Sequence, residues 1–360
     1  MLAEEHIRKA EQEKKNIKCV VWDLDNTLWQ GTLLESDKVV LMPGVVDVIQ
    51  ELDKRGILQS IASKNDFETA WEQIGKYELQ EYFVYPQINW GNKSDSIRYI
   101  SETLNISVNT FAFIDDQVFE REEVSHILPE VLTVDAADIP RLLDMEKLQP
   151  KFITYESALR RKIYQDEIRR RRSKEEFRGN NEEFLATLGM CMSIRTASEQ
   201  DLRRAEELTI RTNQLNTTGY TYSYEELYGF LQSREQLLLV AELDDKYGCS
   251  GIIGLALITR QPDTWILKLL IMSCRVMTRG VGTIMLSYIM HQAKCKAVKL
   301  RAEFVHNDRN RMMYVTYKFN GFYEVSDNNG LVLLENDPEK IPPYPPYITV
   351  RASFEEGAGA

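Results

Sequence analysis

Short apolar, β-rich segments alternate with amphipathic helical segments from residue 17 to about residue 140 of this 360-residue chain. The segments typical of strands are 18–23, 57–63, 111–116 and 131–135, and those typical of helices are 44–56, 66–77, 94–105 and 120–129. Strands separated by helices of this length favour a parallel sheet with helices on both faces. Such a sheet binds ligands beyond the carboxyl ends of its strands, so polar residues there are the first candidates for chemistry.

A second alternation of strands and helices begins at residue 190. The charged segment 141–189 is typical of a helical connector, and we interpret its run Arg169–Arg172 as a solvated helix face. A chain of 360 residues is long enough for two cores. The sequence therefore predicts an α/β domain at 17–140, the connector, and a second α/β domain at 190–350.

The overall composition disfavours several classes of protein. A net charge of −11 argues against a nucleic-acid-binding surface, since phosphate backbones require a basic face. The N-terminus is charged and does not resemble a secretory signal, and the longest apolar runs, 251–258 and 265–272, are too short to span a bilayer. Five cysteines without a CxxC pair favour a reducing compartment. We expect a cytoplasmic protein without nucleic-acid or membrane partners.

Carboxylates stand at the ends of two predicted strands. Asp23 and Asp25 follow the first strand, where one carboxylate can attack an electrophile and its neighbour can transfer protons. Asp115 and Asp116 follow a later strand and offer oxygen ligands suited to Mg²⁺. These positions predict a site for phosphoryl chemistry at one edge of the sheet.

Three further polar residues fit a phosphate. Ser63 lies just past its strand and Asn65 precedes the next helix, where a hydroxyl and helix-start amides can hold a phosphate group. In the sequence, Lys93 lies between the predicted strands 57–63 and 111–116, and it can neutralise a phosphate or an acyl-phosphate intermediate. We include Ser63, Asn65 and Lys93 as candidate substrate-binding residues.

The segment DLDNT, Ser63, Lys93 and the pair Asp115/Asp116, in this order on alternating strands, resemble the four motifs of the haloacid dehalogenase (HAD) superfamily. The resemblance implies that Asp23 is a nucleophile that becomes an aspartyl-phosphate and that Asp25 is the general acid/base. Ser63 and Lys93 would hold the phosphoryl group.

The same resemblance implies a magnesium cofactor. Mg²⁺ would be bound by Asp23 with Asp115 or Asp116, and Asp25 is a further candidate ligand. The spacing from Asp25 to Ser63, and from Ser63 to Lys93, leaves room for one helix and a short hairpin but for no cap domain. We therefore expect a HAD-like domain whose site stays open to water unless a large partner or the second domain covers it.

The C-terminal part resembles the GNAT-like fold of acyl-CoA N-acyltransferases. Its clearest segment is 269–286, a strand followed by the loop Arg279–Gly282 and a helix. The loop amides can receive a pyrophosphate or a pantetheine phosphate, which makes Arg279, Gly280 and Gly282 candidate binding residues. Ile284 departs from the pattern, where a small residue is usual.

Cys274 would then lie where the acyl group of a bound thioester sits, beside the splay between two parallel strands. His306 ends the neighbouring strand and can act as its general base, with Asp308 or Asn310 orienting the ring. A Cys–His pair is suited to forming an acyl-thioester enzyme. The alternatives are that Cys274 is a core residue, or that Cys19, on the strand leading to Asp23, is the special cysteine.

The two units together are similar to the FkbH-like family, the glyceryl transferase/phosphatases of polyketide assembly lines. Matching segments include 20–29, 113–124 and 211–216, and the similarity spans residues 18 to about 325. The family takes glyceryl from 1,3-bisphosphoglycerate, removes phosphate, and passes glyceryl to the phosphopantetheine thiol of an acyl carrier protein. Within 211–216, Arg211 and Asn213 are candidates to bind glycerate hydroxyls or to form the domain interface. The alternative is that they are only a polar helix terminus.

Two alternatives remain open at this point. The chain can be a Mg²⁺-dependent phosphatase for a small phosphorylated metabolite whose C-terminal domain is only a lid. Alternatively, the C-terminal domain can be a degenerate acyltransferase that docks a carrier protein without catalysis. The order of dephosphorylation and acyl transfer, and the fate of the glyceryl unit, do not follow from the sequence.

Overall fold

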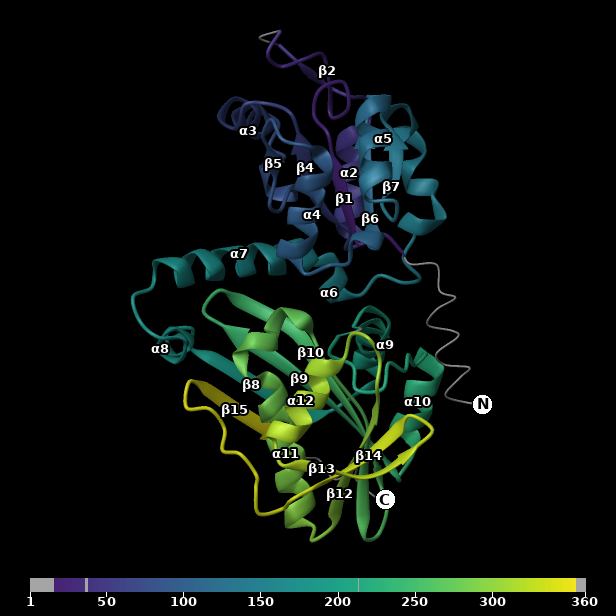
Figure 1. Ribbon diagram of the computed structural model, residues 1–360, viewed down its shortest axis with the longest axis vertical. Helices are drawn as coiled ribbons and strands as arrows, with labels where there is room; N and C mark the ends of the chain where they lie inside the picture. Colours follow the sequence, from purple (N-terminus) through teal and green to yellow (C-terminus); the bar gives the residue numbers. More distant parts are fainter. Residues whose placement is uncertain (1–15, 36–37, 213, 354–360) are drawn as a thin grey trace. The chain divides into compact units, whose positions relative to one another are not determined.

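The computed structural model describes residues 16–35, 38–212 and 214–353. They form two compact units that divide between Ile168 and Arg169, inside helix α7 (Arg160–Glu176) (Figure 1). Each unit has its own sheet and its own core. In these ranges no helix is both long enough and apolar enough to cross a membrane.

The first unit is built on a parallel sheet of five strands in the order β5-β4-β1-β6-β7. Its strands are β1 (Cys19–Trp22), β4 (Leu58–Ser63), β5 (Gln87–Ile88), β6 (Phe111–Asp115) and β7 (Leu132–Asp135). Its helices are α2 (Val45–Lys54), α3 (Phe67–Lys76), α4 (Lys93–Leu104), α5 (Val118–Ile127) and α6 (Tyr155–Ala158), with 3₁₀ segments at Gln80–Tyr82, Val108–Thr110, Ala136–Asp144 and Glu146–Leu148. Between β1 and β4, the described residues form only the hairpin of β2 (Trp29–Gln30) and β3 (Val40–Leu41) and helix α2. The expected α/β class without a large cap is confirmed.

Strand β1 shows why the strands of this sheet are continuous apolar runs. Val20 and Trp22 pack into one hydrophobic cluster, while Cys19 and Val21 pack into another, and all four are fully buried. A strand covered on both faces needs apolar side chains at every position. Burial raises the pKa of the Cys19 thiol, so Cys19 fits a core residue and not a nucleophile.

The second unit contains a mixed sheet of eight strands in the order β13-β14-β12-β11-β10-β9-β8-β15. Its strands are β8 (Met190–Thr196), β9 (Gln236–Asp245), β10 (Gly248–Arg260), β11 (Thr264–Met272), β12 (Lys299–Val305), β13 (Phe322–Asn328), β14 (Leu331–Asn336) and β15 (Ile348–Ser353). Its helices are α8 (Asn181–Ala186), α9 (Leu202–Arg211), α10 (Tyr224–Gln232), α11 (Val281–Cys295) and α12 (Arg311–Phe319), with 3₁₀ segments at Glu199–Asp201 and Cys274–Arg279. Strands β11 and β12 are parallel neighbours, as are β8 and β15. This unit is also α/β, as expected.

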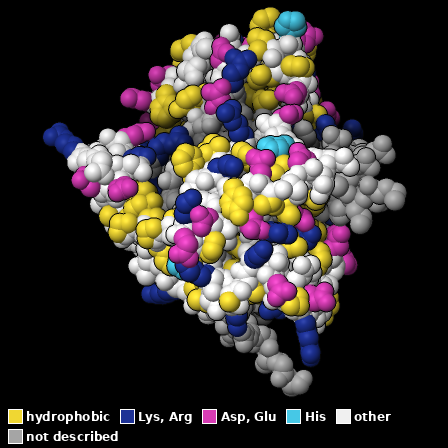
Figure 2. Space-filling model, turned by 60° about the horizontal axis from the view of Figure 1, so that its bottom comes forward, with side chains coloured by type: hydrophobic (Ala, Val, Ile, Leu, Met, Phe, Trp, Pro, Cys, Tyr) yellow, Lys and Arg dark blue, Asp and Glu magenta, His cyan; other side chains and the backbone are white. Residues whose placement is uncertain are grey.

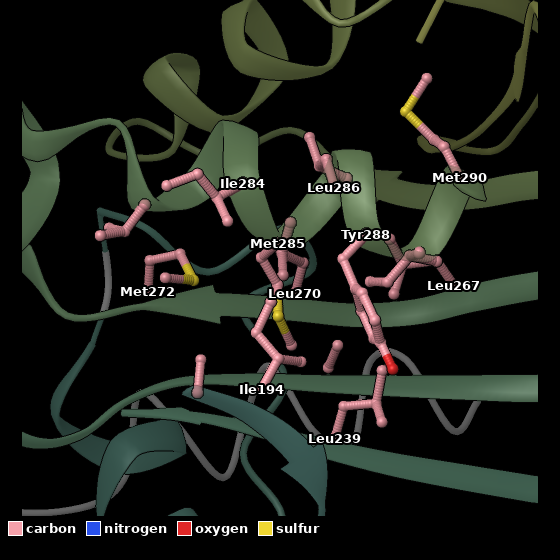
Figure 3. Packing of buried hydrophobic residues seen from close by; sticks show 14 of the residues in the cluster. Ile194, Leu239, Leu267, Leu270, Met272, Ile284, Met285, Leu286, Tyr288 and Met290 are labelled. Atoms are coloured by element: carbon pink, nitrogen blue, oxygen red, sulfur yellow. The ribbon is translucent and has the colours of Figure 1, made fainter. Parts of the chain in front are cut away.

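Helix α11 covers one face of the second sheet. Its residues Ile284, Met285 and Tyr288 share one large hydrophobic cluster with Leu270 and Met272 of β11 (Figure 3). Helices α9 and α10 contribute to a separate cluster with other residues of the central strands. The side chains of β11 thus enter two cores, which fixes the strand that leads to Cys274.

Charged side chains of both signs are interspersed on the face of the molecule drawn in Figure 2. Lys and Arg side chains lie there among Asp, Glu and hydrophobic side chains in no regular order. Charges of opposite sign at short spacing partly cancel each other's field in solution.

Gly56 generates a prediction about the first core. It has a left-handed backbone (φ +67°), and an added Cβ would lie 2.4 Å from the carbonyl oxygen of Ser157. We predict that Gly56→Ala lowers the free energy of unfolding by about 2–4 kcal/mol, of which about 1–2 kcal/mol comes from the left-handed conformation. Urea unfolding of the purified chain measures this loss.

Gly44→Ala is the matched control for that prediction. Gly44 is also left-handed (φ +75°), but within the described ranges no atom lies within 4 Å of its added Cβ. It should lose only the conformational part, about 1–2 kcal/mol. Equal losses in the two variants would contradict the importance of the contact with Ser157.

Candidate active site

Lys93 joins two carboxylates at the carboxyl edge of the parallel sheet. Its Nζ lies 2.6 Å from Oδ1 of Asp23 and 2.5 Å from Oδ2 of Asp115. Asp23 follows β1, Asp115 ends β6 and Lys93 begins α4, and all three are buried. Because the neighbouring strands β1 and β6 are parallel, their ends bring together residues that lie far apart in sequence.

The charges of this cluster perturb one another. Burial raises the pKa of Asp23 to about 7, against the attraction of Lys93, and the nearby charge of Asp115 adds to the rise. Burial raises the pKa of Asp115 as well, again opposed by Lys93. Burial disfavours the Lys93 ammonium, but the two carboxylates outweigh it and raise its pKa, so Lys93 stays charged.

The donor set fits a hard divalent cation. Oxygen atoms of Asp23, Asp115 and Asp116 lie within 4.8 Å of one another. Oδ1 of Asp116 is buried, and among the residues that the structure describes it has no hydrogen-bond partner. A buried carboxylate oxygen without a partner is costly unless a cation binds it, and three carboxylates suit Mg²⁺.

The carboxylate of Asp25 has another environment. Its Oδ1 accepts hydrogen bonds from Nε1 of Trp29 (2.8 Å) and from the backbone N–H of Leu33 (3.1 Å). Its Oδ2 accepts a hydrogen bond from Nδ2 of Asn65 (3.0 Å). Asp25 is not part of the three-carboxylate group found among the described residues, so its side chain is not placed as a metal ligand.

Ser63 and Asn65 lie at the same edge of the sheet. Ser63 is buried at the end of β4, the neighbour of β1, and its carbonyl accepts a hydrogen bond from the N–H of Asn89 (3.0 Å). Asn65 is buried two residues further on, beside Asp25. Four of the sequence-predicted motifs therefore meet at one edge, although binding of substrate by Ser63 and Asn65 stays a prediction.

Two residues of this site were missed by the sequence reasoning. The hydroxyl oxygen of the fully buried Thr27 accepts a hydrogen bond from the backbone N–H of Asp116 (3.0 Å) and so fixes the second carboxylate pair. Trp29 bonds to Asp25, as described above. Both belong to the segment 20–29. The signal available in the sequence was a threonine and a tryptophan that closely follow the two aspartates.

Apolar side chains are exposed along the edge that carries the site. Phe67 begins α3 after β4, Trp90 lies in the loop before Lys93, and Val118 and Phe119 begin α5 after β6. All four side chains are exposed to solvent, Phe119 to 71%. Each belongs to a segment that follows the carboxyl end of a strand of the parallel sheet.

In the second unit, Cys274 begins a 3₁₀ segment (Cys274–Arg279) one residue beyond the end of β11, after Ser273. It is partly buried and packs against the main hydrophobic cluster. His306 follows β12 and is exposed, with its ring centroid 4.9 Å from that of Phe304 and 5.1 Å from that of Tyr314. Both residues thus follow parallel neighbouring strands.

A chain segment separates the ends of these two strands. Strands β11 and β12 pair with each other only over their first residues. Further along, residues 215–217, here called the insert, lie beside the end of β11. The N–H of Thr217 donates to the carbonyl of Leu270 in β11 (3.1 Å), and the carbonyl of Thr217 accepts from the N–H of Val305 in β12 (3.0 Å). The insert therefore acts as a short strand between β11 and β12.

The insert bears on the proposed Cys–His pair. It places about two strand spacings, roughly 10 Å, between the backbones at the ends of β11 and β12. The N–H of Met272, two residues before Cys274, donates to the carbonyl of Leu215 in the insert (3.0 Å). Cys274 and His306 can meet only if their side chains reach across the insert, so this pairing stays a prediction.

Asn310 fastens the insert in place. It is fully buried, and its Nδ2 donates to the carbonyls of Asn216 (3.1 Å) and Val305 (2.8 Å), while its Oδ1 accepts from the N–H of Asn307 (3.1 Å). The sequence predicted that Asn310 binds substrate or orients His306. In the structure its amide instead bonds to backbone groups of the protein.

The expected anion loop before α11 has different partners. Arg279 is buried, and its guanidinium lies 3.5 Å from a carboxylate oxygen of Asp245, which also binds Arg170 at 2.8 Å. Gly280 is left-handed (φ +77°), and an added Cβ would lie 2.8 Å from the hydroxyl oxygen of Tyr347. The guanidinium of Arg279 is thus directed to a carboxylate, and an aromatic residue lies against the loop. At Gly282 an added Cβ would make only ordinary contacts.

The two candidates from segment 211–216 are not brought to Cys274 by any described contact. Arg211 pairs with Glu207 on its own helix at 3.1 Å. Asn213 lies outside the described residues. Their proposed contacts with substrate therefore stay predictions.

Comparisons with known proteins give matches among solved structures. No protein-family model and no curated protein sequence matches the chain. The N-terminal part of BF1531 from Bacteroides fragilis, which contains a phosphatase domain complexed with Mg, is 30% identical over 41% of this chain and 43% of that chain, with a TM-score of 0.33. The chain thus spans less than half of that protein.

The other similar structures include acetyltransferases. The PaiA N-acetyltransferase from Thermoplasma acidophilum, in complex with coenzyme A, is 21% identical over 41% of this chain and 98% of that chain, with a TM-score of 0.33. The GNAT domain of S. lividans PAT is 16% identical over 40% of this chain and 89% of that chain, with a TM-score of 0.34. The three structures named here are thus a phosphatase domain, an N-acetyltransferase and a GNAT domain.

The unpaired oxygen of Asp116 predicts how Mg²⁺ affects stability. Mg²⁺ should raise the unfolding temperature of the wild type, because a ligand that binds only the folded state stabilises it. Asp116→Asn should require at least about tenfold more Mg²⁺ for the same rise, since one carboxylate ligand is lost. Asp95→Asn, which removes an exposed carboxylate of α4, is the control and should respond like the wild type. An unchanged response of Asp116→Asn would contradict the site.

The raised pKa of Asp23 predicts a pH effect on metal-free protein. The group has a pKa near 3.8 when unperturbed and about 7 when folded, so the folded state binds more protons in this window and stability falls as pH rises through it. Asp23→Asn cannot ionise and should melt several degrees higher than the wild type at pH 8, but much less so at pH 5, because about 1 kcal/mol shifts Tm by about 2–4 °C. Thermal unfolding with a chelator measures this. The same difference at both pH values would refute the cause.

Proposed function

We propose that the first unit is a Mg²⁺-dependent phosphatase and that the second unit transfers an acyl group. In detail, the chain would dephosphorylate 1,3-bisphosphoglycerate and load glyceryl, through a thioester at Cys274, onto the phosphopantetheine of an acyl carrier protein in polyketide biosynthesis. The observation that carries this proposal is the buried Asp23–Lys93–Asp115 cluster with the unpaired oxygen of Asp116.

The phosphatase half follows from the positions of these side chains. A carboxylate oxygen of Asp23 would attack the phosphorus of a phosphate monoester, and the bond from phosphorus to the alcohol oxygen would break. Asp25 would give its proton to the departing alkoxide and then take one from the water that hydrolyses the aspartyl-phosphate. The ammonium of Lys93 would offset negative charge on the phosphoryl group.

Mg²⁺, when bound by Asp23, Asp115 and Asp116, would supply further positive charge beside the phosphoryl oxygens. Such a site is needed for the C3 phosphate, because uncatalysed hydrolysis of a phosphate monoester is extremely slow. The C1 group is an acyl phosphate, which is already a reactive acyl donor.

The acyl-transfer half would use Cys274. Its thiolate would attack C1, the bond from C1 to the phosphate oxygen would break, and inorganic phosphate would leave while glyceryl remains as a thioester. The thiol of the carrier protein would then take over the glyceryl group. The position of Cys274 close to the end of β11, partly buried against the core, supports a fixed thiol at the edge of the sheet.

One feature of the structure supports the proposed partner. The exposed Phe67, Trp90, Val118 and Phe119 around the first site favour a macromolecular partner, since a bisphosphate has no apolar surface to cover them.

The main alternative is a phosphatase of a small phosphorylated metabolite whose second unit docks a carrier protein without catalysis. The partners of Arg279 and Asn310 favour it, because both side chains are directed to groups of the protein and not to a ligand. This alternative keeps the Mg²⁺ site and Asp23 but gives Cys274 no chemistry.

Intact-protein mass spectrometry after mixing with Mg²⁺ and freshly generated 1,3-bisphosphoglycerate tests the proposal. A glyceryl adduct is expected on the wild type and on Cys249→Ala, a control that removes an exposed cysteine, but not on Cys274→Ala. Asp23→Asn should form an adduct that is heavier by one phosphate and is not converted further. Phosphate release from C3 without an adduct on any variant would leave only the phosphatase alternative.

A further inference from the structure

Asp25 is held by donors from two separate chain segments. Trp29 and Leu33, which follow Asp25 in sequence, both bind its Oδ1, at 2.8 and 3.1 Å. Asn65, which follows β4, binds its Oδ2 at 3.0 Å. Bonds to both oxygens from different directions fix the rotation of the carboxylate as well as its position.

A tight turn returns the indole of Trp29 to Asp25. The carbonyl of Leu24 accepts hydrogen bonds from the N–H groups of Leu28 (2.8 Å) and Trp29 (3.2 Å), which closes the chain just after β1. Trp29 is fully buried in the hydrophobic cluster that also contains Trp22, and it pairs with Leu41 of β3. Its ring therefore has little freedom, and the N–H stays directed at Asp25.

Asn65 has one polar atom that the protein does not satisfy. The residue is 1% exposed, and its Nδ2 donates to Asp25. Its Oδ1 is buried and, within the described ranges, has no hydrogen-bond partner. A buried amide oxygen without a partner is costly, so a ligand with a hydroxyl group would be favoured there.

We propose that Trp29 and Asn65 are positioning residues that hold Asp25 toward the leaving alcohol, and that Oδ1 of Asn65 accepts a hydrogen bond from a hydroxyl of that alcohol. This inference rests on the proposed phosphatase activity and names its substrate class, phosphate monoesters of hydroxylated alkyl alcohols. Oδ1 of Asp25 already accepts two hydrogen bonds, whereas Oδ2 has a single described donor and keeps room for the transferred proton.

The expected reaction step is balanced at named atoms. As the bond from phosphorus to the alcohol oxygen breaks, that oxygen takes the proton from Oδ2 of Asp25, and the phosphoryl group remains on Asp23. An alkyl alcohol needs this proton to leave, whereas a nitrophenolate leaves as a stable anion. Loss of positioning should therefore affect the two kinds of ester differently.

The test compares kcat/KM for glycerol 3-phosphate and for p-nitrophenyl phosphate, because kcat/KM covers the steps up to release of the alcohol. Trp29→Phe keeps an aromatic ring but removes the indole N–H, and Asn65→Leu removes the amide at similar volume. Each should lower kcat/KM about 10- to 100-fold for the glycerol ester and by less than about threefold for the nitrophenyl ester. Asp25→Asn should give the same pattern more strongly.

Trp22→Phe is the matched control. It removes an indole N–H that donates to Oε1 of Gln59 (3.1 Å) in the same hydrophobic cluster, without a bond to Asp25. It should change kcat/KM for both esters by the same factor. Because Trp29 and Asn65 come from different segments, one variant suffices if the other does not fold.

Two results would overturn the inference alone. One is an equal loss for both esters in Trp29→Phe and Asn65→Leu, which would make these residues only structural. The other is an unchanged kcat/KM for the glycerol ester. If the wild type hydrolyses neither ester in the presence of Mg²⁺, the proposed phosphatase function fails, and this inference fails with it.

Discussion

The attraction between one buried ammonium and two buried carboxylates organises the first unit. Lys93 is the first residue of α4, and it can reach both Asp23 and Asp115 only if β1 and β6 end side by side. Removing three charged groups from water is costly, and their mutual attraction offsets only part of this cost because negative charge is in excess. The fold thus holds an excess of negative charge in place, which a bound cation would offset.

Much of this site was predictable because parallel sheets impose a simple geometry. Asp23, Ser63 and Asp115 each stand at the end of a strand, so their proximity followed from the strand–helix alternation. The environment of Asp25 did not follow, because it depends on a turn that directs the side chain of Trp29 backward. Sequence spacing identifies which residues can meet, but not which hydrogen bonds hold them.

The second unit was less predictable at the level of its candidate site. The strand before Cys274 and the helix α11 after it were expected, since an apolar run, a glycine pair and a helix follow one another. The role of Asn216 and Thr217 was not, because a polar loop that pairs with two strands has the same composition as a solvated one. Arginine commonly binds anions, but the buried guanidinium of Arg279 lies beside the carboxylate of Asp245, a residue far from it in the sequence.

The insert also has a consequence for how the second sheet is assembled. Thr217 is synthesised long before its partners, since Leu270 and Val305 lie about 50 and about 90 residues further along the chain, and contacts over such separations form slowly. On the ribosome, the insert can pair with β11 once Leu270 and Met272 have emerged, but with β12 only after Val305 has emerged, and Asn310 follows later still. Completion of the sheet near Cys274 is therefore a late event in biogenesis. A chain that stops before residue 310 lacks the side-chain amide of Asn310, which joins the insert to the end of β12.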